Sequence, residues 1–563
     1  MPDFAIVQTY KDVFQKSSQS EIIDLLKGYS PETLLIILGK TSASLLSGVN
    51  SLQIFTSYTS SYTNHYYRAE ILKILSRLKS NPNNVLFNEK SNIRFLKIVI
   101  ENFKFLNAHK IDEDIEILEI NFFRVYLIIN ELIYDSNDSK NFLEGIPSEH
   151  FLEFAQILMA KKTIVEQQEN DFFSDIVKIK AHLHYYFLHE NKLLEEFYKL
   201  HNITNPDLWI FEIFRILTLA DDYKNIAFSV DDENYISDYC DGILINNIIG
   251  KSSITEIEVK LNSLFKKDGK YYVLNWSHFG QHLFHRITYQ LYELYRSKYE
   301  IKLKFEKYKS MISEKVAEKI VFRKAVEKSF RRKGTFISYD TQSFLGFPDC
   351  YLRYNNFVCV FEFKDNALTK EFIENSSYDF AKSFIDERFI VNTAKGIEKQ
   401  KGISQLVKVI ESLNVKIENV DPILLNRYKK TSVEIFPILV VSESMFSQPS
   451  VESYLTKEFR KIKPSNTGFR KINDLTVINM SFLINYFLNS DCPDFLSIIK
   501  EYVDKKKRYK EKGFIPNFPS INNSKYSETS KAKQLIHVLK ELPICNIDID
   551  EQLIRVRSQK SER

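Results

Sequence analysis

Apolar residues recur at three- and four-residue spacings through most of the first 250 residues of the chain. This spacing puts them on one face of an α-helix and so predicts a series of amphipathic helices. Polar breaks divide the series near residues 80–84, 135–138 and 202–206. No segment repeats at a fixed period, so we expect residues 1–250 to form one irregular helical domain.

The pattern changes after residue 250. Asp268-Gly269 predicts a turn into a short strand, and a long helix is expected over residues 277–309. We therefore expect residues 251–310 to connect the helical domain to a second one. Residues 314–333 predict a further helix, with Gly334 as its C-terminal stop.

Residues 357–363 carry the strongest strand signal. The residues at odd positions from Phe357 to Phe363 are apolar, and so are Val358 and Val360. A strand that is apolar on both faces is usually buried on both sides. Together with the helical first half, this pattern predicts an α+β multidomain chain. Further strands are expected at 335–340 and 433–441, in a core over residues 311–455 that is followed by a C-terminal α/β extension over 456–563.

Composition excludes several classes of protein. Glycine and proline number 14 each among 563 residues, which disfavours a turn-rich all-β fold. No apolar run reaches eighteen residues and the N-terminus lacks a signal-peptide layout, so we expect no membrane association. The five cysteines are scattered, without metal-binding spacing, as is typical of free thiols in a reducing cytoplasm. We therefore expect a cytoplasmic protein.

The net charge of +4 hides an asymmetry between the two halves of the chain. Residues 1–300 contain 31 Lys and Arg against 40 Asp and Glu, whereas residues 301–563 contain 46 against 33. A polyanion such as a nucleic acid would be attracted to the second half.

Three charged residues lie close to the expected central strand. In GFPDCYLRYNNFVCVFEFKD, Asp349 precedes a short strand, a turn follows, and Glu362 and Lys364 end the second strand. Side chains alternate along a strand, so Glu362 and Lys364 share a face, and the hairpin can bring Asp349 beside them. Two carboxylates and an ammonium group suit a divalent cation that activates water against a phosphodiester. The alternative is a turn cap and a solvated ion pair without catalytic meaning.

This motif resembles the active site of the PD-(D/E)xK nuclease superfamily, which has the restriction-endonuclease-like fold. The resemblance implies an α/β core with a mixed sheet, Mg²⁺ or Mn²⁺ bound by Asp349 and Glu362, and a catalytic Lys364. It also implies that the helix before the core supplies another acidic metal ligand, for which Glu327 and Glu318 are the alternatives.

The resemblance extends to the helix that follows the motif. Many members of the superfamily place a basic or glutamine residue there, near the scissile phosphate, and Lys401 and Gln405 occupy one face of this helix. The resemblance thus implies a Mg²⁺-dependent nuclease, and we expect a DNA endonuclease. By analogy of architecture, a role in bacterial anti-phage defence or restriction is expected, with the helical half as a sensor, regulator or contact for a protein partner or second copy.

Two clusters of basic residues are expected to contact the phosphate backbone of DNA. The first lies on the helix before the core and comprises Arg323, Lys324, Lys328, Arg331, Arg332 and Lys333. The second lies near the C-terminus and comprises Lys505, Lys506, Lys507, Arg508, Lys510 and Lys512. The alternative for either cluster is a solvated helix face.

Two other function classes remain open. The chain can be a non-catalytic nucleic-acid-binding or scaffold protein on a nuclease-like fold, or an adaptor whose partner binds residues 1–250. Two weaker signals favour structural roles. Gly39-Lys40-Thr41 lacks the first glycine of a phosphate-binding loop, and His278, His282 and His285 share a helix face without an acidic partner.

Overall fold

The computed structural model describes most of the chain. The described residues are 6–59, 63–109, 114–134, 145–164, 172–218, 226–230, 236–251, 253–299, 302–330, 332–339, 347–366, 368–369, 371–372, 375, 377–392, 399–465, 467–487, 494–510 and 536–545. Arg331, Lys512 and Cys492 lie outside this part, as do the side chains of Lys510 and His282.

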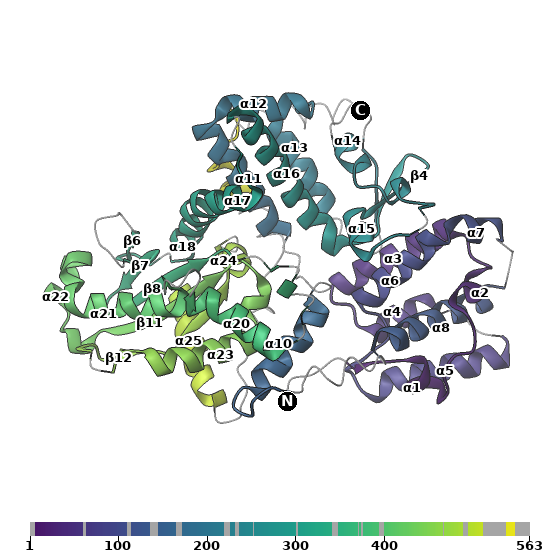
Figure 1. Cartoon of the computed structure of the whole chain (residues 1–563), viewed down its shortest axis with the longest axis horizontal. Coiled ribbons are helices and arrows are strands. Elements are labelled where there is room, and N and C mark those ends of the chain that lie inside the picture. Colours follow the sequence, from purple (N-terminus) through teal and green to yellow (C-terminus); the bar gives the residue numbers. More distant parts are fainter. Residues whose placement is uncertain are drawn as a thin grey trace.

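The first 134 residues form a helical group, at the right of Figure 1. Its helices are α1 (Tyr10–Phe14), α2 (Ile22–Leu26), α3 (Pro31–Leu46), α4 (Ser51–Tyr58), α5 (His65–Ser80), α6 (Glu89–Glu101), α7 (Phe103–Ala108) and α8 (Ile115–Tyr134). Strands β1 (Ile6–Val7) and β2 (Asn84–Val85) pair in parallel across the group. Leucine, isoleucine and phenylalanine side chains of these helices form one buried cluster, as the three- and four-residue spacing predicts.

A second group of elements lies above and between the two sides of Figure 1. It comprises α11 (Phe172–His189), α12 (Asn191–Leu200), α13 (Pro206–Thr218), α14 (Ile236–Asp241), α15 (Glu256–Leu261), α16 (Trp276–Tyr299) and α17 (Phe305–Ile312), with a 3₁₀ turn η2 (Ile245–Asn247) and strands β3 (Ala227–Phe228), β4 (Leu264–Lys267) and β5 (Lys270–Val273). Asp268 and Gly269, both with positive φ, turn β4 into β5. The helix expected over 277–309 is therefore two helices, α16 and α17.

A six-stranded mixed sheet occupies the other side of the molecule (Figure 1). Its strands are β6 (Phe336–Tyr339), β7 (Cys350–Tyr354), β8 (Phe357–Lys364), β11 (Glu434–Val441), β12 (Lys471–Ile472) and β13 (Thr476–Asn479). β6, β7 and β8 form an antiparallel meander, and β11 then pairs in parallel with β8. The expected α+β architecture, with a helical first half and a mixed sheet, is confirmed.

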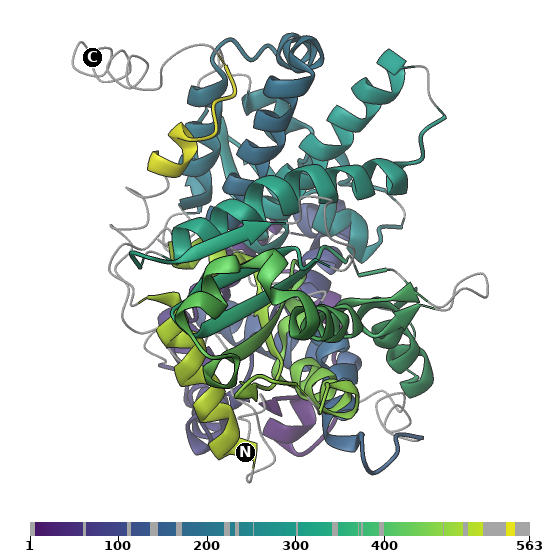
Figure 2. The same cartoon turned by 90° about the vertical axis from the view of Figure 1, so that its left-hand side faces the viewer.

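Helices cover both faces of this sheet (Figure 2). One face packs against η3 (Ser313–Phe322), α18 (Arg323–Ser329), α24 (Met480–Phe487) and α25 (Phe495–Lys510). The other packs against α10 (Phe151–Ile164), α20 (Tyr378–Phe389), α21 (Gly402–Val420), α22 (Pro422–Arg427) and α23 (Pro449–Ile462). The remaining short elements are β9 (Val391–Asn392), β10 (Lys399–Gln400) and the 3₁₀ turns η5 (Lys430–Ser432) and η6 (Ser444–Ser447).

Strand β8 is the centre of this arrangement. Cys359 and Phe361 point into the core shared with η3 and α18, whereas Val358 and Val360 point into the core shared with α21. All four side chains are fully buried, as the doubly apolar pattern predicts. The charged residues Glu362 and Lys364 therefore lie at the end of a strand that is buried between two hydrophobic cores.

Pro437 explains why the outer edge of the sheet is divided into β12 and β13. Glu434 and Ser442 donate their N–H groups toward β8, so the nitrogen of Pro437 faces the opposite neighbour. Proline has no N–H to donate, and the ladder is interrupted there, between the partners of Ile435 and Ile438.

The helix before the sheet differs from an ordinary α-helix. Residues Ser313–Phe322 are π-helical, and the backbone N–H of Arg323 donates to the carbonyl of Glu318, five residues earlier. The side chains of Glu314 and Lys319, also five apart, form an ion pair of 2.6 Å. The π-helix is rare, and its single-turn form within α-helices is frequently found at functional sites. The helix ends at Ser329, earlier than the expected stop at Gly334.

Packing crosses the expected domain boundaries, as two examples show. β12 and β13 belong to the same sheet as β8, so the sheet continues past residue 455. Helix α10, within the first 250 residues, packs against α20 and α23 beside the sheet (Figure 1). Among the described helices, none is both long enough and apolar enough to cross a membrane.

Candidate active site

The β7–β8 hairpin brings Asp349 opposite Glu362. In the antiparallel register Cys350 pairs with Phe361, and one further step beyond the ladder places Asp349 across from Glu362. Residues in such positions share a face, with Cβ atoms roughly 5 Å apart. Asp349 is fixed at the end of the ladder because its Oδ2 accepts a hydrogen bond of 2.7 Å from the backbone N–H of Phe363.

Lys364 completes the group. Its Nζ lies 2.5 Å from Oε1 of Glu362, so the two side chains share one face of β8 and form an ion pair. The Glu362 side chain is 3% exposed and that of Lys364 is 17% exposed. Solvent therefore reaches the group from the side of Lys364 and the partly exposed Asp349.

The charges in this group strongly perturb one another. Burial, followed by repulsion from Asp349, raises the pKa of Glu362 to about 8 in spite of the nearby Lys364. Burial disfavours the charged form of Lys364, but attraction to Glu362, Asp349 and Glu318 outweighs it and raises the pKa of the ammonium group. Perturbed acids that gather at the rim of a core are typical of functional sites.

Of the two alternative acids on the helix before the sheet, Glu318 is the one whose charge interacts with Asp349 and Glu362. Burial, followed by repulsion from Asp349, raises the pKa of Glu318 to about 7, and Glu318 in turn affects Glu362. Glu327 is exposed, and its Oε1 accepts a hydrogen bond of 3.1 Å from the Tyr339 hydroxyl. Val316, Val321 and Val326 are all buried and lie five residues apart in the sequence. This spacing could have predicted the π-helical winding of the segment that carries Glu318.

Lys401 and Gln405 lie at the start of α21, which packs against β8. Burial, followed by repulsion from Lys364, lowers the pKa of Lys401. Attraction to Glu362 acts in the opposite direction and is weaker. The carboxamide oxygen of Gln405 accepts a hydrogen bond of 2.9 Å from the N–H of Gly402 and so caps the helix.

Gly402 allows α21 to begin where it does. Its φ is +43°, and a Cβ there would lie 2.8 Å from the carbonyl oxygen of Phe389. Only glycine fits both the left-handed backbone and this close approach.

The donor atoms fit a hard divalent cation. Asp349 and Glu362 offer carboxylate oxygens, and a cation would replace the proton that the raised pKa of Glu362 favours. Within the described part of the chain, no group of three or more His, Cys, Asp and Glu side chains is arranged so that it could hold a metal ion. Mg²⁺ does not need three such side chains, because it is usually held by one or two carboxylates together with water and substrate phosphates.

Most cations of the first basic cluster are already paired. Lys324 lies 2.9 Å from Glu541, and Lys328 also pairs with Glu541. Arg332 pairs with Asp494 at 3.0 Å. These pairs compete with phosphate, whereas Lys333 is exposed.

The second basic cluster contains one residue that must be removed from the predicted interface. Lys506 is 3% exposed, and its ammonium group contacts Glu452 at 2.6 Å and the carbonyl of Leu475 at 2.7 Å. It holds α25 against α23 and cannot reach a phosphate from there. Lys505 and Lys507 pair with acidic neighbours on α25, and Arg508 is exposed.

The weaker sequence signals have structural explanations. Gly39 lies inside α3, where a Cβ would come within 2.6 Å of the carbonyl of Val273, so its role is close packing. His278 and His285 lie on α16, and no metal-binding cluster includes them among the described residues.

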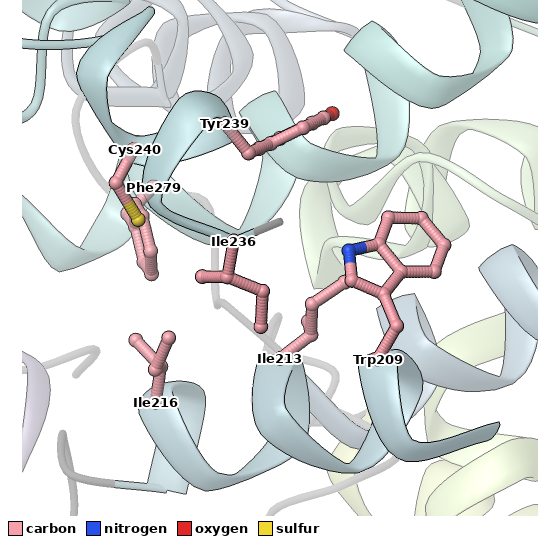
Figure 3. Close-up of a pocket in the computed structure, with 7 residues that line it drawn as sticks. All are labelled: Trp209, Ile213, Ile216, Ile236, Tyr239, Cys240 and Phe279. Atoms are coloured by element: carbon pink, nitrogen blue, oxygen red, sulfur yellow. The ribbon is translucent and has the colours of Figure 1, made fainter. Parts of the chain in front are cut away.

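An apolar cavity between α13, α14 and α16 is shown in Figure 3. It is lined by Trp209, Ile213, Ile216, Ile236, Tyr239, Cys240 and Phe279. Its volume of about 10 Å³ has room for one water molecule at most. It carries no charged group and takes no part in the site around Glu362.

No family model matches the chain, and neither the curated proteins nor the solved structures include one that is significantly similar to it.

Proposed function

We propose that the chain is a Mg²⁺-dependent nuclease of the PD-(D/E)xK type that hydrolyses phosphodiester bonds in DNA. The observation that supports the proposal best is the placement of Asp349 opposite Glu362, with Lys364 bonded to Glu362 on the same face. The order of elements supports a restriction-endonuclease-like core, because a helix, three antiparallel strands, a helical segment with α20, α21 and α22, and a parallel strand follow one another.

Each side chain then has a separate task. Asp349 and Glu362 would hold the cation, which when bound polarises a phosphate oxygen and a water molecule. Lys364 would stabilise the negative charge that develops on the phosphate. Lys401 would contribute a second positive charge beside it, and Gln405 keeps the start of α21 in place. A role in anti-phage defence, with the helical half as sensor or partner-binding region, remains part of the proposal.

Purified protein is expected to cleave DNA in Mg²⁺ or Mn²⁺ and to be inactive in EDTA. Lys364→Met should lower the cleavage rate by about 100-fold, because one charge-stabilising group is lost. The variant should still bind Mn²⁺ in calorimetry, because both carboxylates remain. Parallel assays on RNA and on circular and linear DNA would define the substrate.

Asp379→Asn, at an exposed position on α20, is the control and should cleave like the wild type. A wild type without cleavage and without Mn²⁺ binding would instead support a non-catalytic nucleic-acid-binding protein on the same fold.

Glu318→Gln and Glu327→Gln form a matched pair on one helix. We expect the first to lower the cleavage rate by about 10- to 100-fold, because Glu318 acts on both metal-binding acids. Glu327→Gln should change the rate less than threefold, because its carboxylate is exposed and bonded to Tyr339. Rates at saturating Mg²⁺ would check this, and the reverse order would restore Glu327 as the third acid.

A further inference from the structure

We propose that Arg323 binds a phosphate of the nucleic acid beside the acidic site and that Tyr339 holds its guanidinium group in place. This inference rests on the proposed function and names the basic residue that recognises the substrate backbone next to the cation-binding acids.

Arg323 lies at the same end of the sheet as the acids. Its backbone N–H donates to the carbonyl of Glu318, so it follows Glu318 by one turn of π-helix on the same side. Its guanidinium group lies 4.7 Å from the centre of the Tyr339 ring. Tyr339 pairs with Cys350, the residue next to Asp349, so this contact lies one step along the strands from Asp349, on the face of the sheet that packs against η3 and α18.

The guanidinium group keeps unused hydrogen-bonding capacity. Its Nε is buried and has no hydrogen-bond partner, and among the described residues no carboxylate forms an ion pair with Arg323. A buried donor without an acceptor is unfavourable, because its hydration is lost and not replaced. A phosphate oxygen would satisfy it, because the planar fork of arginine matches two phosphate oxygens.

Tyr339 acts as a positioning residue. Its ring stacks beneath the guanidinium group, and its hydroxyl is within 3.1 Å of both the Arg323 carbonyl and Glu327. These contacts fix both the side chain and the backbone of Arg323, so less conformational entropy is lost when a phosphate binds.

The neighbouring lysines of the same helix do not have this freedom. Lys324 and Lys328 both form ion pairs with Glu541 on the C-terminal segment 536–545. Four side chains of that segment are buried in the core: Val538, Leu539, Leu542 and Ile544. Releasing the segment would expose these apolar side chains to water, which is unfavourable, so these pairs stay closed. Of Arg323, Lys324 and Lys328, Arg323 is the one without an ion pair to a described carboxylate.

The test measures binding of a short DNA duplex in EDTA, over a series of salt concentrations. Arg323→Met should weaken binding by about 10-fold and reduce the slope of log K against log salt by about one, as for the loss of one phosphate contact. Arg323→Lys should keep the slope and recover only part of the affinity. Tyr339→Leu should weaken binding while the slope is unchanged, and Tyr339→Phe, which keeps the ring, should restore it.

Lys319→Met is the control, because Lys319 is an exposed cation on the same helix that is paired with Glu314. It should bind DNA like the wild type, and the Mn²⁺ affinity of Arg323→Met should be unchanged. Unchanged affinity and slope in Arg323→Met, in a wild type that cleaves DNA and loses cleavage in Lys364→Met, would overturn this inference alone. A wild type that neither binds nor cleaves nucleic acid would overturn the proposed function as well.

Discussion

Glu362→Gln is expected to lower the rate of metal-dependent DNA cleavage by at least about 1,000-fold, to the background of the assay. Glutamine keeps the size of the buried side chain but removes the negative charge that would face the cation. Lys364 also loses its bonded carboxylate, which lies 2.5 Å away. The variant should therefore lose the bound cation, and the ammonium group of Lys364 should no longer be held in position.

Two measurements separate this loss from misfolding. Single-turnover cleavage of labelled DNA gives the rate, and calorimetry with Mn²⁺ gives the affinity, which should also disappear. Circular dichroism should show a folded variant, because glutamine fits the space of a side chain that is 3% exposed. If the variant cleaves DNA within tenfold of the wild type, Glu362 does not hold the catalytic cation and the proposed site is wrong.

Metal binding is expected to strengthen steeply with pH. The pKa of Glu362 is raised to about 8 and that of Glu318 to about 7, so both acids hold protons near neutrality when no cation is bound. A cation held by Asp349 and Glu362 must displace the proton of Glu362. The Mn²⁺ affinity should therefore rise by about tenfold per pH unit between pH 6 and 8 and level off above pH 8. Calorimetry in two buffers with different ionisation enthalpies would count the protons released.

The stability of the metal-free protein should change in the opposite direction. A carboxyl group whose pKa is raised on folding contributes stability that is complete below its unfolded pKa of 4.5 and is lost as pH rises through about 8. The free energy of unfolding of the wild type, relative to Glu362→Gln, should thus fall by on the order of 3 kcal/mol between pH 5 and pH 9. Urea unfolding in EDTA would measure it. If the free energy of unfolding of the two proteins changed with pH in the same way, the pKa of Glu362 would not be raised in the folded protein.

Much of the core could be predicted from the sequence, because the residues of strand β8 by themselves show that it is a buried strand. Apolar residues on both faces of Phe357–Lys364 require burial on both sides, and the structure places them in two separate cores. The turn before β8 and the two-residue alternation fix which side chains share a face. The prediction that Glu362 and Lys364 lie together depended only on this local geometry.

Other features depended on contacts between distant segments. The sequence pattern of Lys505–Arg508 suggests one exposed basic face. Lys506 instead points inward, because it forms an ion pair with Glu452 on α23. The sequence predicts that Lys324 and Lys328 bind phosphate. In the structure, both form ion pairs with Glu541, which lies far along the chain. Charge pairing between residues more than 50 positions apart has no signature in a local window.

The sequence by itself determined the helical first half, the buried hairpin and the pairing of Glu362 with Lys364, because side-chain periodicity and strand alternation act over a few residues. Only the tertiary structure decided that Glu318 rather than Glu327 approaches Asp349, and that six of the described residues in the two basic clusters form ion pairs within the molecule. The physical reason is that burial and electrostatic attraction depend on distance in space, and the chain sets that distance only when it is folded.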